Sequence, residues 1–121
     1  MYKKSCFVVP IYDCYIHVFV ADNLSRVCRY YSTEPISKDE CDNDRGFFLP
    51  KKHKGNYVIA LHPTEADETT VSHESLHAAK QILSDCGISN LTSDNEEVET
   101  YLCSYIVLQV AKRFKKLRKR K

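Results

Sequence analysis

The residues best suited to chemistry are two histidines and a glutamate in the segment His73-Glu74-Ser75-Leu76-His77. If this segment is helical, the two imidazoles lie one above the other on one face and can bind one metal ion. Zinc accepts imidazole nitrogens at about 2.0–2.1 Å. Glu74 is rotated by about 100° from His73, so it can reach a water molecule on the metal and remove its proton. The segment predicts a hydrolytic zinc site, with His73 and His77 as ligands and Glu74 as general base.

The same residues would also suit the solvent side of an ordinary amphipathic helix. One polar stripe contains Thr70, His73, Glu74, His77, Gln81 and Ser84. Apolar residues occur on two other sides of this helix, so we expect the helix to be largely buried and the stripe to be narrow. An HExxH pattern arises by chance in roughly one sequence in a hundred of this composition. A zinc site therefore needs support from a third ligand.

The next helix offers that third protein ligand, which a catalytic zinc site requires. Its first residues, within SDNEEVETYL, include three candidates: Glu96, Glu97 and Glu99. Since His77 lies about 14 Å from the end of its helix and Glu97 about 4.5 Å into the next, a returning loop has about 9 Å to cover. The intervening residues span this distance easily. We predict Glu97 as the ligand and Glu96 as the alternative, although acidic residues also suit any helix N-terminus.

The elements that must position these residues form a predicted α+β domain. The sheet, antiparallel or mixed, is expected to pack on an antiparallel pair of C-terminal helices over about 70–85 and 94–117. Residues 15–21 are predicted to be a strand, and a short helix follows from residue 24. A hairpin is expected over 46–50 and 56–63, and Phe7-Val8-Val9 gives a short strand at best. The predicted order is β-α-β-β-α-α.

Charge is distributed unevenly along the 121 residues. The last ten, KRFKKLRKRK, carry eight of the 18 basic side chains and none of the 16 acidic ones, which leaves ten basic against 16 acidic residues in the first 111. We therefore separate a single domain at 1–111 from a basic helix end or tail at 112–121. Such an end suits the negative pole of a helix dipole, and it could also make a weak nucleic-acid contact.

Cysteine usage and the apolar runs bear on the compartment. The six cysteines have no CxxC spacing, and we expect them to be reduced and mostly buried: Cys6, Cys14, Cys28, Cys41, Cys86 and Cys103. The N-terminal segment does not resemble a signal peptide, and the apolar stretch 15–21 is too short to span a bilayer. We expect a cytoplasmic protein without a membrane segment.

HESLH, followed at residues 95–102 by NEEVETYL, resembles the gluzincin type of zinc metallopeptidase. The layout is more closely similar to small HExxH proteins of phages and their bacterial hosts, with a VPIYD start, a GFF…YVIAL hairpin and an EExxxYL helix. The resemblance implies a Zn²⁺-dependent peptidase that acts on a peptide or protein substrate in a bacterial or phage-infected cell. Its ligands would be His73, His77 and Glu97, and its general base would be Glu74.

The chain departs from this family at several points. Thermolysin-like enzymes have the pattern NExxSD, whereas Thr100 stands at the position of its Asp here, and the Asn95-Glu96 match favours Glu96 as ligand. The chain also lacks the second lobe of large peptidases. The alternative function is a non-catalytic, metal-stabilised protein that uses its basic tail to bind nucleic acid or a protein partner.

A peptidase also needs a surface that holds the substrate and a group that stabilises the transition state. The strand at 57–61 could be the sheet edge that holds substrate, or it could be a central strand. A transition-state stabiliser could be supplied by Tyr101, Tyr105 or His62, although each also suits a packed structural role. His17 and His53 have no evident partner and are interpreted as structural.

Overall fold

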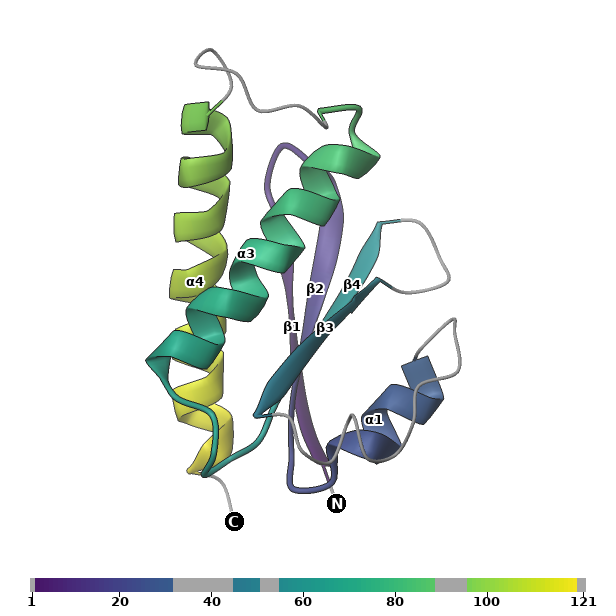
Figure 1. Cartoon of the computed structure of the whole chain (residues 1–121), viewed down its shortest axis with the longest axis vertical. Helices are drawn as coiled ribbons and strands as arrows, with labels where there is room; N and C mark the ends of the chain where they lie inside the picture. The colour runs from purple at the N-terminus through teal and green to yellow at the C-terminus, as the bar shows by residue number, and fades with distance from the viewer. Residues whose placement is uncertain (1, 32–44, 51–54, 89–95, 120–121) are drawn as a thin grey trace.

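The computed structural model describes residues 2–31, 45–50, 55–88 and 96–119. It has four strands and three helices, two of them long and C-terminal, which confirms the predicted α+β class (Figure 1). In chain order these are β1 (Tyr2–Val9), β2 (Cys14–Ala21), α1 (Leu24–Tyr31), β3 (Gly46–Pro50), β4 (Asn56–Leu61), α3 (Glu68–Asp85) and α4 (Glu96–Arg118).

The strands form one mixed sheet in the order β1-β2-β4-β3. β2 and β4 are parallel, whereas β1 pairs with β2 and β3 pairs with β4 in antiparallel fashion. The predicted hairpin at β3 and β4 is thereby confirmed. Of the two options for residues 57–61, the central position is correct, and the edge beside β4 is β3.

The expectation of only a short strand at Phe7-Val8-Val9 is wrong. β1 is eight residues long and pairs with β2 along its whole length, from Tyr2↔Ala21 to Val9↔Cys14. Its first half is polar because the strand lies at a sheet edge, where only Phe7 and Val9 are buried. Backbone pairing with β2 makes this segment a strand, and the hydropathy of the segment itself does not reveal it.

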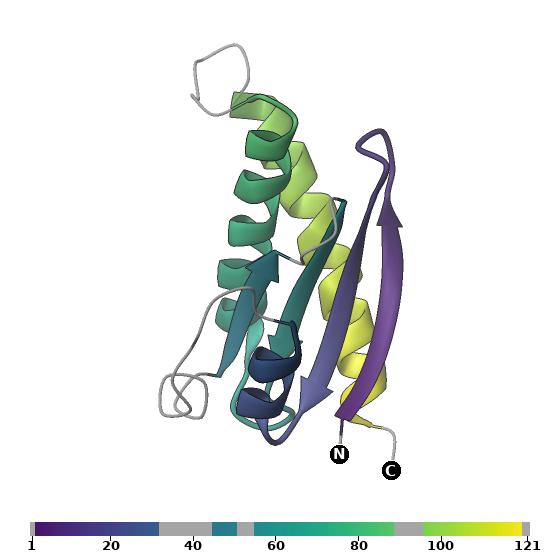
Figure 2. The ribbon, with the colours of Figure 1, turned by 90° about the vertical axis from the view of Figure 1, so that its right-hand side faces the viewer.

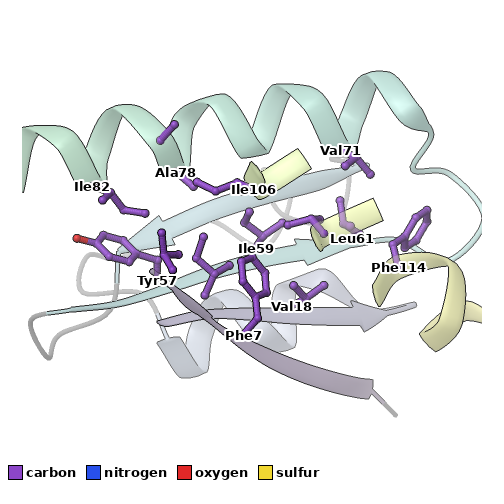
Figure 3. Packing of buried hydrophobic residues seen from close by; sticks show 14 of the residues in the cluster. Phe7, Val18, Tyr57, Ile59, Leu61, Val71, Ala78, Ile82, Ile106 and Phe114 are labelled. Atoms are coloured by element: carbon purple, nitrogen blue, oxygen red, sulfur yellow. The ribbon is translucent and has the colours of Figure 1, made fainter. Parts of the chain in front are cut away.

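The two long helices cover one face of the sheet, and α1 lies on the other (Figures 1 and 2). On the helix side, Ile59 and Leu61 of β4 pack with Ile82 of α3 and Ile106 of α4 in one buried cluster (Figure 3). On the α1 side, Val58 and Ala60 belong to a second, smaller cluster with residues such as Phe19, Leu24 and Val27. Because successive residues of β4 point to opposite faces of the sheet, this strand contributes side chains to both clusters.

Helix α3 begins at Glu68, two residues before the predicted start, because Asp67 caps it. The Asp67 carboxylate accepts hydrogen bonds from the Thr70 backbone N–H at 3.0 Å and from the Thr70 hydroxyl at 3.1 Å. In return, the backbone N–H of Asp67 donates to Thr70 Oγ1 at 3.2 Å. These hydrogen bonds from Thr70 lower the pKa of Asp67. The cap fixes where the helix and its histidines begin.

The cysteine expectation is only partly correct. The described Cys6, Cys14, Cys86 and Cys103 form no disulfide with one another, yet only Cys14 is buried, whereas Cys6 and Cys86 are exposed. Cys41 lies outside the described residues. Within the described ranges, no helix is both long enough and apolar enough to cross a membrane.

Candidate metal centre

Helix α3 places His73, Glu74 and His77 close together, as the sequence pattern predicts. One nitrogen from each imidazole and one carboxylate oxygen lie within 4.8 Å of one another, so this His–Glu–His group could hold a metal ion. Both histidines are exposed, whereas Glu74 is only 7% exposed. The group therefore combines two accessible imidazoles with one buried carboxylate.

The spacing of the imidazoles fits a tetrahedral ion. Nε2 of His73 and Nε2 of His77 lie 3.2 Å apart, and the rings meet edge to face at an interplanar angle of 82°. Two nitrogens that bind one tetrahedral zinc at about 2.05 Å are separated by about 3.4 Å. The pair is thus already at the separation that zinc requires, and both Nε2 atoms are directed to one place.

Glu74 lies slightly farther away than a ligand would. Its Oε2 atom is 4.0 Å from Nε2 of His73. That distance exceeds the separation of about 3.4 Å between two atoms that bind the same zinc ion. It suits a carboxylate that hydrogen-bonds a water molecule beside the ion. The geometry therefore favours a base over a ligand for Glu74.

The side of α3 that carries Thr70 and His77 faces β3. Gly46 of β3 approaches this side of α3 so closely that an added Cβ would meet Cγ2 of Thr70 at 3.0 Å. Since His77 comes seven residues after Thr70, the two side chains lie within about 20° of each other around the helix. Figure 1 shows α3 between α4 on one side and β3 on the other. The group thus lies beside the edge strand of the sheet.

The predicted third ligand, Glu97, is not part of the group, and neither is Glu96. The ion pair of Lys80 with Glu99, with 3.2 Å between Nζ and Oε1, sets how the two antiparallel helices align. On that alignment, Glu97 lies about five residues, or about 7.5 Å, beyond the level of His77. Loop length permits the approach that the sequence suggested, but the helix register keeps Glu97 outside the group. Glu97 as a ligand stays a prediction.

The orientation of His77 around α3 is the second reason why Glu97 lies outside the group. Ser72 and Val71 line a groove together with Val107 and Leu108 of α4, so this side of α3 faces α4. His77 lies five residues after Ser72, which places it about 140° around the helix. His77 therefore points away from α4, whereas His73 shares the side of α3 that carries Lys80.

The three residues considered as transition-state stabilisers lie apart from one another. Tyr105 donates a hydrogen bond from its hydroxyl to the carbonyl oxygen of Val8 at 3.3 Å, on the opposite edge of the sheet from β3. Tyr101 is 73% exposed on α4. His62 Nδ1 accepts hydrogen bonds from the backbone N–H groups of Thr64 and Glu65 and so supports the turn before α3.

Of the other two histidines, His17 hydrogen-bonds Asn56 at 3.0 Å, which agrees with a structural role. His53 lies outside the described residues. Neither the buried position of Glu74 nor the neighbouring β3 edge was recognised from sequence. The only available signal was that the helix has apolar residues on several sides.

Tyr57 closes the C-terminal end of the α3–sheet interface. Its hydroxyl donates to a carboxylate oxygen of Asp85 at 2.5 Å, and Gln81 donates to the other oxygen at 2.9 Å. Burial, with this hydrogen bond, raises the pKa of Tyr57. Nearby, burial raises the pKa of the Cys14 thiol to about 11. These groups hold protons tightly and serve to fix α3 on the sheet.

Comparisons of the chain with protein-family models, with curated proteins and with solved structures find no match. The function must therefore be argued from the residues of the site.

Proposed function

We propose that the protein is a zinc-dependent hydrolase that acts on peptide bonds. The observation that carries this proposal is the 3.2 Å separation of the two imidazole nitrogens beside the buried Glu74 carboxylate. Without a metal ion, the two imidazoles can hydrogen-bond each other at this distance. A shared metal ion would bind both nitrogens at nearly the same separation, with the Glu74 carboxylate beside it.

Each residue of the group has one role in the proposal. His73 and His77 would bind the ion through Nε2, and water and substrate would occupy the other positions in place of the usual third protein ligand. A zinc ion held there would supply Lewis-acid chemistry, polarising a carbonyl group and making a water molecule more acidic. Glu74 accepts the proton of the attacking water and passes it to the leaving amine. Its burial, at 7% exposure, holds the carboxylate in one orientation for that transfer.

The peptide substrate is proposed from the neighbouring strand. Among the described strands, β3 pairs on one side with β4 and has no strand on its other side. Such an edge offers unpaired backbone N–H and C=O groups to an extended peptide. Because His77 lies on the side of α3 that faces β3, a peptide on that edge would lie close to the ion and to Glu74. The resemblance of HESLH and NEEVETYL to gluzincins agrees with a peptide substrate.

Metal analysis tests the first step. The purified protein is expected to bind one equivalent of zinc, and His73→Ala and His77→Ala are each expected to lose it. His17→Gln is the matched control, since His17 pairs with Asn56 and not with the group. Zinc content by elemental analysis and affinity by competition with a chromophoric chelator give the readout. Full zinc retention by both alanine variants would rule out the site.

A further inference from the structure

A basic face at the C-terminal end of α4 lies outside the candidate metal centre. We define it by five exposed side chains on the last turns of the helix: Lys112, Lys115, Lys116, Arg118 and Lys119. Lys112, Lys116 and Lys119 recur at i, i+4 and i+7, so they form one row about 10 Å long. Residues 112–118 are helical, so this part of the predicted tail is an ordered helix end. The charges therefore have fixed relative positions.

A distant part of the chain adds to this face. Arg113 of α4 lies over the Phe7 ring at 4.7 Å, and Tyr105 hydrogen-bonds Val8, so α4 runs along β1 toward its first residues. Lys3 shares the strand face of Phe7, because alternate residues point the same way. Figures 1 and 2 show the first residues of β1 near the end of α4. Tertiary packing thus brings a further cation toward the row.

From this convergence we propose that the basic face binds the phosphate backbone of a nucleic acid. A row of about 10 Å spans about three phosphates of one strand, at about 3.4 Å of axial rise per phosphate. The five side chains of the face are all Lys or Arg, which contact phosphates without reading bases. The binding is therefore independent of base sequence.

The rest of the molecule restricts where such contact occurs. The first 111 residues contain ten basic against 16 acidic side chains, so the body repels a polyanion on average. A nucleic acid approaching this protein is steered toward the basic face, where five cationic side chains of the described residues lie close together. The contact is also independent of the metal ion, because the group lies on α3 while the basic face ends α4.

A lipid surface is a poorer fit for the same charges. A helix that lies on a membrane inserts its apolar side between the lipids. The apolar side of α4 is already used, since it packs in the core through Leu102, Ile106, Val110, Phe114 and Leu117. What the basic face presents to a partner is mainly ammonium and guanidinium groups, with Lys115 and Arg118 at the rim of the groove that Val107 and Leu108 line. This chemistry matches phosphates in water.

The test compares the full-length protein with a triple variant, Lys112→Gln/Lys116→Gln/Lys119→Gln. The probe is a fluorescein-labelled single-stranded DNA of about 20 nucleotides, titrated over a salt series starting at about 50 mM. The expected result is binding by the wild type and a slope of log K against log salt that is about two units shallower in the triple variant. EDTA is expected to leave both curves unchanged.

The control removes three lysine charges elsewhere in the chain, in Lys51→Gln/Lys52→Gln/Lys54→Gln. It is expected to keep the wild-type slope to within about one unit. Lys115→Gln/Arg118→Gln provides a second, independent variant of the face and is expected to weaken binding as well. Absence of wild-type binding at the lowest salt would overturn the proposal. Equal losses in the control and the triple variant would do the same, as would tighter binding to phosphatidylserine vesicles than to DNA.

Discussion

The two sides of helix α3 differ in what they present and in what they pack against. The side toward β3 carries Thr70, Glu74, His77 and Gln81, and it holds a buried carboxylate next to exposed imidazoles. The side toward α4 carries small and apolar residues, with Ser72 on a groove and Ala79 and Leu83 fully buried. One helix thus serves the core on one side and a candidate metal centre on the other.

The comparison shows which acidic residue the structure brings to the histidines. A helix that is apolar on several sides can turn its polar stripe toward any neighbour. Packing of Ala79 and Leu83 in the core and the Lys80–Glu99 ion pair hold α4 on one side. His77 consequently lies toward the sheet edge, and the acid beside both histidines is Glu74 of their own helix.

The largest expected effect comes from the side of α3 that faces β3. Glu74→Gln keeps the size of the side chain but cannot accept a proton, so peptide hydrolysis should fall by about 10²- to 10⁴-fold. Zinc affinity should stay within a few-fold, since the 4.0 Å distance to His73 Nε2 argues against ligation. Turnover of a fluorogenic peptide library and zinc competition measure the two quantities. Loss of zinc with loss of activity would make Glu74 a ligand and refute its role as base.

A substitution on the side of α3 toward α4 should lower stability without changing zinc affinity. Leu83 is 1% exposed, so Leu83→Ala should lower the free energy of unfolding by about 2–5 kcal/mol through lost burial and a cavity. Urea unfolding measures this change. Zinc affinity of the folded variant is expected to match the wild type. A large drop in affinity would show that the two sides of α3 are coupled.

Gly46 tests how closely β3 must approach the metal side of α3. A Cβ there would lie 2.9 Å from the Ala60 carbonyl oxygen and 3.0 Å from Thr70 Cγ2. Gly46→Ala should therefore cost about 1–3 kcal/mol of stability by overpacking. It should also weaken zinc binding, because Thr70 and His77 share this side of the helix. Ser72→Ala, on the groove, is the control and should change neither the urea midpoint nor the affinity.

Alkaline pH should loosen the same interface at its C-terminal end. Burial raises the pKa of Cys14 from 9.0 to about 11, and the pKa of Tyr57 is raised as well. Because the folded state holds these protons more tightly than the unfolded state, their stabilisation is complete below about pH 9 and declines as the pH rises toward 11. Urea unfolding at several pH values should show this decline, and Cys14→Ala should make it shallower. Identical pH profiles for the two proteins would contradict the assignment to Cys14.

The smallest effect is expected for Glu97→Gln. Since Glu97 lies on α4, outside the group, zinc affinity should change by less than about threefold, as for other exposed surface groups. The same competition assay used for His77→Ala gives a direct scale. A loss as large as that of His77→Ala would show that α4 moves to supply the ligand predicted from sequence.

Much of the architecture could be predicted from local patterns. The four-residue spacing of His73 and His77 predicted their convergence, because the helix repeat alone brings them together. Alternation and turn residues predicted the β3–β4 hairpin, and the order of elements predicted an α+β domain. The length of β1 was underestimated. Pairing with β2 makes this polar segment a strand, and its own hydropathy does not reveal that.

The sequence by itself determined the candidate metal-binding pair, the general base candidate and the concentration of cations near one end. These properties depend on residue type and on the geometry of a single helix. Tertiary structure alone decided which side of α3 faces β3, where Glu97 lies and how Lys3 approaches α4. Such choices arise from packing between segments far apart in the chain, where burial of apolar surface sets the register and polar residues follow.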